Sequence, residues 1–189
     1  MVTSRLRGAG CLPLVIENDR QTTPLPDGIW KVDPQRSEIG FAVKEMWGLH
    51  TVRGIFGRCD GSLEARAGGA AGELTIEAAS LETGNNRRDK HLRSSAFFDV
   101  ERHPQMVFTA TSVTPRDGGL AVAGELAIGS SRVRLEIPVG VEQTADGALR
   151  LEGYTSVSRQ AAGLAWNVLG TIRGDAMLHA QVTLRRAVS

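Results

Sequence analysis

The stretch RVRLEIPVGV, residues 132–141, decides how we interpret the fold of this chain. Its odd-numbered positions, from Val133 to Val141, all carry valine, leucine or isoleucine, and its even-numbered positions carry arginine, glutamate, proline and glycine. Successive side chains of a β-strand point to opposite faces of the sheet. The alternation therefore predicts a strand with one buried face and one face in water.

Seven other stretches alternate in the same way. They are residues 29–33, 39–44, 52–56, 73–78, 106–111, 120–128 and 176–185. Turn signals such as Asp117-Gly118 and Asp146-Gly147 lie between the stretches and supply the positive φ that tight hairpins need. No long stretch has the period of a helix, so the sequence predicts an all-β chain of about eight antiparallel strands.

Strands of this length leave long unpaired edges in an open sheet, and closure into a barrel removes those edges. We therefore predict an eight-stranded antiparallel barrel, which is wide enough to hold one ligand inside. The predicted barrel domain covers residues 28–189. Residues 1–27 contain Pro13, Pro24 and Pro26 among polar residues and are expected to form a partly disordered extension.

One segment interrupts the strand pattern, RDKHLRSSAFFDVERHPQMVF at residues 88–108. Its first part predicts a short helix between Asn86 and Ser95, with Asn86 as the cap and Asp89 at the third helical position. Arginine, lysine and histidine crowd this helix, and Phe97 and Phe98 follow it. The segment is either a cationic lip beside an apolar opening, suited to an anionic amphiphile, or a solvated connector whose aromatic rings close one end of the core.

Composition excludes several classes of function. A formal net charge of +1 gives no electrostatic reason to expect nucleic acid as a partner. The four histidines are dispersed, and Cys11 and Cys59 have no metal-ligand spacing, so no metal site is predicted. No apolar run is long enough for a transmembrane helix. Nucleophile-elbow, P-loop and dinucleotide motifs do not occur, so no catalytic residue or cofactor is predicted.

The N-terminus resembles a lipoprotein signal only in part. Arg5 and Arg7 look like its basic region and Gly8 to Cys11 like its cleavage site, but the apolar region that should separate the two is missing. We therefore expect a cytoplasmic protein, and two cysteines without clear partners suit a reducing compartment.

Several motifs are similar to those of one family. The motifs are W-K-V-D-P-x-x-S at 30–37, V-R-G-x-F at 52–56, T-G-N-x-x-R-D-x-H-L-R-S-x-x-F-F-D-V-E at 83–101, G-E-L-A-I at 124–128 and R-x-x-x-G-L-x-W at 159–166. Together they resemble the YceI-like family, a lipocalin-like group associated with polyisoprenoid binding. Two positions depart from its pattern: Arg36 stands where the family commonly has histidine, and the turn at 129–133 lacks the usual proline.

The resemblance implies a barrel with an apolar tunnel for a long isoprenoid or fatty lipid tail, and it implies no catalytic machinery. We predict that the aromatic residues line the tunnel and that basic residues of the helix bind the head group. The predicted ligand-binding residues are Phe41, Trp47, Phe56, Arg88, His91, Arg93, Phe97, Phe98, Phe108 and Trp166.

Other interpretations stay open at this point. The aromatic residues are equally consistent with an ordinary filled core. Arg88 and Arg93 would then anchor the loop through Asp89, Asp99 or Glu101. A small enzyme with His91 as general base in the barrel mouth is a rival function, and a module that binds nothing small is another. A homodimer is possible.

Overall fold

The computed structural model describes residues 25–45, 50–67, 69–164 and 175–187. The predicted N-terminal extension therefore lies almost wholly outside the described residues. The strands are β1 (Gly28–Val32), β2 (Glu38–Glu45), β3 (His50–Phe56), β4 (Cys59–Arg66), β5 (Gly69–Glu77), β6 (Leu81–Glu82), β7 (Gln105–Arg116), β8 (Gly119–Ile128), β9 (Ser131–Gln143), β10 (Leu149–Val157) and β11 (Ala176–Arg186). The helices are the 3₁₀ turns η1 (Pro34–Arg36) and η3 (Ala78–Ser80) and the α-helix α1 (Asn86–Arg93).

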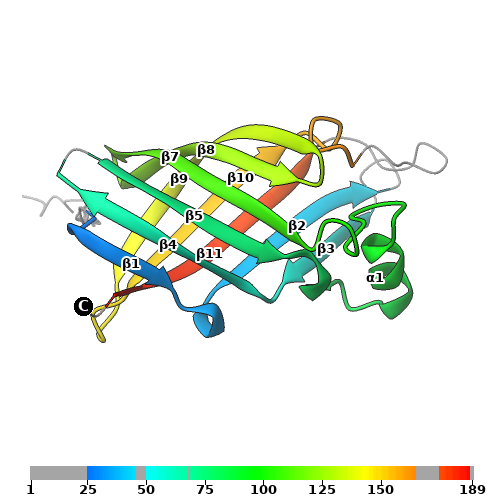
Figure 1. Ribbon diagram of the computed structural model, residues 1–189, viewed down its shortest axis with the longest axis horizontal. Coiled ribbons are helices and arrows are strands. Elements are labelled where there is room, and N and C mark those ends of the chain that lie inside the picture. The colour runs from blue at the N-terminus through cyan, green and yellow to red at the C-terminus, as the bar shows by residue number, and fades with distance from the viewer. Residues whose placement is uncertain (1–24, 46–49, 68, 165–174, 188–189) are drawn as a thin grey trace, which may run out of the picture.

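Eight of these strands close into a barrel (Figure 1). They hydrogen-bond in the order β1-β4-β5-β7-β8-β9-β10-β11, and β11 pairs back onto β1, with Trp30 opposite Arg186. Every pairing is antiparallel. The predicted eight-stranded antiparallel barrel with a short helical insert is therefore confirmed.

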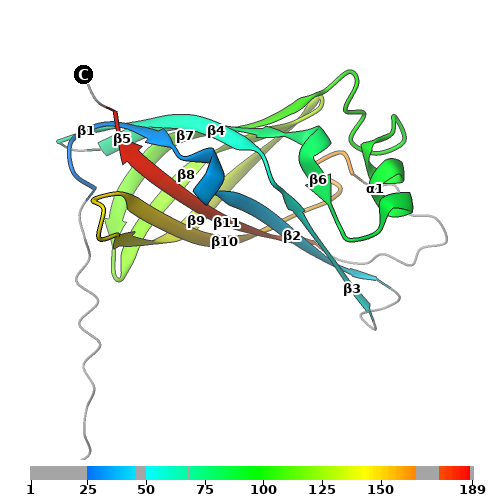
Figure 2. The same ribbon diagram turned by 90° about the horizontal axis from the view of Figure 1, so that it is seen from below.

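The strands β2, β3 and β6 extend the wall at the end that carries α1. One edge of β11 pairs with β1 through residues 184–186 and with β2 through residues 177–181. Thr183 bridges the break between them, because its N–H donates to Ser37 Oγ at 3.0 Å and its carbonyl accepts from Asp33 N at 2.8 Å. Thus β1, η1 and β2 follow one another along the barrel as one interrupted strand (Figure 2).

The sequence missed two strands of the barrel, β4 and β10. The inward positions of β4 include Gly61, and those of β10 include Gly153 and Thr155, so neither segment has an unbroken apolar alternation. Two of the eight predicted strands, at 39–44 and 52–56, instead lie in the β2–β3 pair outside the closed ring. Pairing with a strand on each side, rather than local hydrophobicity, holds β4 and β10 in the sheet.

Candidate functional site

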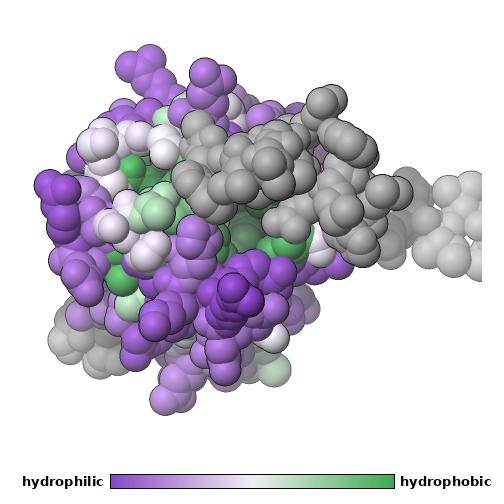
Figure 3. Space-filling model, turned by 90° about the vertical axis from the view of Figure 1, so that its right-hand side faces the viewer, coloured by the Kyte–Doolittle hydropathy of each residue, from purple (hydrophilic) through white to green (hydrophobic). Residues whose placement is uncertain are grey.

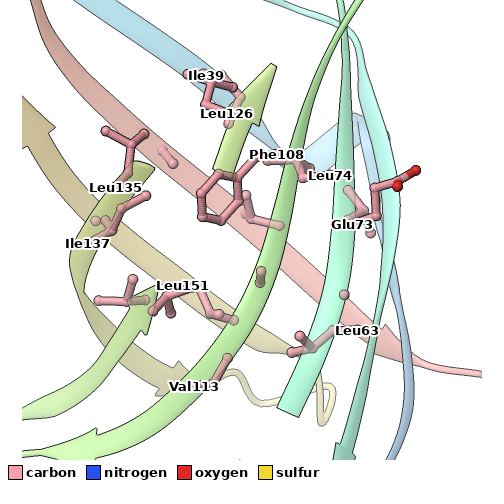
Figure 4. Close-up of a pocket in the computed structure, with 18 of the residues that line it drawn as sticks. Ile39, Leu63, Glu73, Leu74, Phe108, Val113, Leu126, Leu135, Ile137 and Leu151 are labelled. Atoms are coloured by element: carbon pink, nitrogen blue, oxygen red, sulfur yellow. The ribbon is translucent and has the colours of Figure 1, made fainter. Parts of the chain in front are cut away.

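An apolar cavity of about 160 Å³ occupies the centre of the barrel (Figure 4). Its wall consists of inward-facing side chains from the strands of the ring, among them Phe108, Leu126, Leu135 and Leu151. These side chains point toward one another across the barrel in Figure 4. The interior is therefore not completely filled, unlike that of a module that binds nothing small.

A second cavity, of about 180 Å³, lies at the α1 end. Its wall combines residues of β2 and β3 with the segment that carries α1. The two cavities share four aliphatic residues, Ile39, Ile76, Leu126 and Leu178. These four side chains lie between the two cavities, which follow one another along the barrel, and we call the two cavities together the tunnel.

The tunnel opens where the wall of strands is incomplete. The pairing of β7 with β5 begins at Gln105 opposite Glu77, and β6 pairs only with β3 among the described residues. The segment 83–104, which carries α1, lies at this gap between β6 and β7. Seen from this end, hydrophobic side chains form the floor of a hollow that hydrophilic side chains border (Figure 3). We call this end the mouth.

Helix α1 is fixed to the strand before it by a buried carboxylate. Asn85, and not Asn86 as predicted, caps the helix, since its side chain accepts from the N–H groups of Arg87 and Arg88. Asp89 is consequently the fourth helical residue rather than the third. It is 5% exposed and accepts hydrogen bonds from both N and Oγ1 of Thr83. It therefore anchors the helix and is not simply a charge at the helix N-terminus.

The two predicted head-group arginines also make structural contacts. Arg88 donates from Nε to Thr83 Oγ1 at 2.8 Å and from Nη2 to Thr83 O at 3.0 Å. Arg93 Nη2 donates to the carbonyl of Leu81. Among the described residues, neither arginine forms an ion pair with the acidic residues of the segment. Both arginines do anchor the segment, as in the alternative interpretation, but through hydrogen bonds to Thr83 and Leu81. Arg88 also lines the mouth, as does His91, whereas Arg93 lines neither cavity.

The predicted aromatic residues form a continuous chain at the mouth. Phe41 and Phe56 have ring centroids 5.8 Å apart, Phe56 and Phe98 are 5.7 Å apart, and Phe97 and Phe98 are 5.0 Å apart. All four rings line the mouth cavity. Phe108 lines the central cavity instead. Trp47 and Trp166 lie outside the described residues, so their contact with a ligand stays a prediction.

Two glycines of the sequence motifs make room for these rings. A Cβ atom at Gly54 would lie 2.5 Å from Phe41 Cε1, and one at Gly124 would lie 2.7 Å from Phe108 Cζ. Real side chains do not approach so closely, so glycine is required wherever the ring lies across the neighbouring strand. The glycines of V-R-G-x-F and G-E-L-A-I therefore shape the wall of the tunnel.

Most of the tunnel wall is aliphatic and was not nominated from the sequence. Leu126, Leu135, Ile137 and Leu178 line it, and each occupies an inward position of an alternating strand. The signal that could have found them is the alternation within each strand, which places them on the apolar face of β8, β9 and β11. Arg36, the departure from the family pattern, lines neither cavity and pairs with Asp146 at 2.7 Å.

Within the described parts of the chain, no three His, Cys, Asp or Glu side chains gather closely enough to hold a metal ion. No described helix is long and apolar enough to span a bilayer. Cys59 is buried and forms no disulfide with any described residue, and burial raises the pKa of its thiol.

Comparisons with known proteins identify relatives for most of the chain. Residues 30–188 match the model of the YceI-like domain. UPF0312 protein plu2095 of Photorhabdus laumondii is 35% identical over 104 residues, which cover 52% of this chain and 54% of the relative. Protein YceI of Escherichia coli O6:H1 is 31% identical over the same shares of the two chains. The chain thus spans about half the length of the curated relatives it matches.

Solved structures share the fold at lower identity. Burkholderia cenocepacia BcnA aligns with a TM-score of 0.72 and 19% identity, over 80% of this chain and 98% of BcnA. A polyisoprenoid binding domain from Saccharophagus degradans, implicated in plant cell wall breakdown, aligns with a TM-score of 0.68 and 13% identity, over 84% of this chain and 98% of the domain. Together with the match to the domain model over most of the sequence, the fold leads to one conclusion: this chain belongs to the YceI-like family.

Proposed function

We propose that this chain binds a long-chain amphiphilic lipid in the tunnel and thereby sequesters or carries it. The observation that carries the proposal is the pair of apolar cavities that follow one another along the barrel. Burial of each methylene of a tail contributes roughly 0.8 kcal/mol. A tail that fills the tunnel would therefore bind tightly with few polar contacts, and its polar head would stay at the mouth.

The mouth offers donors for an anionic or polar head group. Two of the five guanidinium N–H groups of Arg88 are directed to Thr83, and the side chain still borders the cavity beside His91. Arg87 and Lys90 are exposed on the same helix. We propose that Arg88 and His91 contact the head group and that Arg93 acts indirectly, by holding α1 against β6.

An isoprenoid is the first ligand to test, because the structurally similar domain from Saccharophagus degradans is a polyisoprenoid binding domain. The proposal needs no catalytic group and no cofactor. The rival role of His91 as a general base was suggested by the closeness of Asp89 and Asp99 in the sequence. Of these two residues, Asp89 accepts hydrogen bonds from N and Oγ1 of Thr83 and so has a structural role.

The test is extraction of the purified protein followed by lipid mass spectrometry. We expect a prenyl or acyl species to co-purify in stoichiometric amount and to be lost from Phe108→Asp, which places a charge in the tunnel wall. A melting curve must first show that this variant folds. A folded protein that neither retains such a lipid nor binds one added in detergent would refute the proposal.

The cytoplasmic location and the homodimer stay predictions. Fractionation of cells that express the natural gene, with detection by antibody, tests the first. Light scattering of the lipid-free and lipid-loaded protein tests the second.

A further inference from the structure

The tunnel ends inside the barrel on the side of β1, β10 and β11, although on β8 its wall reaches Leu120, one residue from the start of that strand. On β1 and β11 its wall reaches Val32 and Leu184, which lie opposite each other. The next inward residue of β1 away from the mouth is Trp30, and the next of β10 beyond Leu151 is Leu149. These two residues are 3% and 0% exposed, and neither lines a cavity. A filled layer therefore closes the tunnel at its inner end.

Trp30 has the largest side chain of this layer, and the small side chains of nearby alanines leave room for its indole. Leu63 is the β4 partner of Trp30, and the next inward residues away from the mouth are Ala65 on β4 and Ala70 on β5, which lie opposite each other and pack in the same core cluster as Trp30. The indole is fixed in place, since Nε1 donates to Pro26 O at 3.0 Å. Leu25 packs against two core clusters at this end. We call Trp30 and Leu25 the plug.

We propose that the plug sets the longest lipid tail that this protein can enclose, with Trp30 as the residue that determines the specificity for length. The inference rests on the proposed function. A tail enters from the mouth and gains affinity with each methylene that leaves water, until its end reaches the last lining residues, Val32 and Leu184, behind which the indole fills the barrel. Further methylenes remain outside the mouth and add nothing.

The geometry gives the scale of this limit. The tunnel follows β8 from Leu120 to Ile128. Eight residues at about 3.3 Å each, with a strand tilt of about 40°, span roughly 20 Å along the barrel axis. One further layer of side chains corresponds to two residues, or about 5 Å along the axis. A smaller side chain at position 30 should therefore admit a tail that is longer by several methylenes.

The test measures dissociation constants of the full chain for a homologous series of straight-chain saturated fatty acids, by displacement of a fluorescent fatty acid. For the wild-type protein we expect affinity to rise about fourfold per methylene and then to level off at one length. In Trp30→Val the plateau should begin several methylenes later. In Val139→Phe, which enlarges a wall residue near the plug, it should begin earlier. Ile29→Ala is the matched control, because Ile29 is 53% exposed on the outer side of the same strand and its removal should leave the plateau where it was.

The outcomes distinguish a failure of the length limit from a failure of the proposed lipid binding. If Trp30→Val folds, as judged by its circular dichroism and melting curve, and keeps the wild-type plateau, the plug does not measure length, although the proposed lipid binding stands. If Trp30→Val does not fold, Val139→Phe decides, and an unshifted plateau in that variant overturns the inference. If no member of the series binds the wild-type protein, the proposed function fails and the length limit fails with it.

Discussion

The two ends of this barrel are built from different interactions. At the mouth, α1 is held by hydrogen bonds that the side chains of Asn85 and Asp89 accept and that Arg93 donates to the carbonyl of Leu81. At the opposite end, the plug and Leu149 fill the interior with tightly packed apolar groups. Packed apolar side chains stabilise the whole fold, whereas polar contacts of one segment stabilise mainly that segment. The plug end therefore stabilises the whole barrel, whereas the mouth can change its local structure when a ligand binds.

Removing the indole of the plug should have the largest effect. We expect Trp30→Ala to lower the free energy of unfolding by about 3–5 kcal/mol, because it leaves a cavity in a filled layer. Denaturant titration measures this loss. Ile29→Ala on the outer face should change stability by less than about 0.5 kcal/mol, and an equal loss in both variants would contradict the difference between the ends.

At the mouth, the matching substitution is Asp89→Ala. It leaves N and Oγ1 of Thr83 without their acceptor, which should cost about 1–3 kcal/mol. Hydrogen exchange followed by mass spectrometry should find faster exchange in α1 and unchanged exchange in β8 and β9. Glu101→Ala removes an exposed carboxylate of the same segment and serves as the control. Faster exchange throughout the barrel would mean that α1 is part of the global folding unit.

Arg88 and Arg93 of α1 should differ in how they affect the binding of an anionic ligand. Arg88→Ala should weaken an anionic amphiphile about tenfold relative to a neutral amphiphile with the same tail, because a hydrogen bond to a charged group contributes about 1.5–3 kcal/mol. Arg93→Ala should weaken both ligands equally, since Arg93 lines neither cavity and binds Leu81 O. Isothermal titration of the ligand pair measures both ratios. Equal loss for both ligands in Arg88→Ala would assign Arg88 a purely structural role.

The smallest effect concerns Asp146, an exposed carboxylate in the turn between β9 and β10. Hydrogen bonds from Thr144 and Arg36 lower the pKa of Asp146 to about 2. Because its folded pKa lies below the unfolded value of 3.8, Asp146 stabilises the fold above that value, and this stabilisation is lost as the pH falls toward 2. Melting temperatures of the wild-type protein and Asp146→Asn should therefore differ slightly at neutral pH and converge near pH 2. A difference that persists at the lowest pH would show that the carboxylate charge is not its origin.

Much of the fold follows from local sequence alone. The alternation at residues 132–141, and the same pattern in most other strands, marks each strand and its buried face without knowledge of its partners. The cap residues and the charged run placed the helix correctly to within one residue. The aromatic residues pointed to the tunnel wall, since Phe41, Phe56 and Phe108 line it.

The tertiary structure decided what depends on distant partners. β4 and β10 are strands because both of their edges are paired, although their own sequences are weak. Arg93 donates to the carbonyl of Leu81, because the short strand β6 brings that carbonyl within its reach. The position of the plug follows from the register that pairs Trp30 with Leu63, two residues before Ala65 on β4, and from the packing of Trp30 in one core cluster with Ala65 and Ala70. Alternation shows which face of a strand is apolar. Only closure of the barrel determines where the apolar side chains fill the interior and where they leave a cavity.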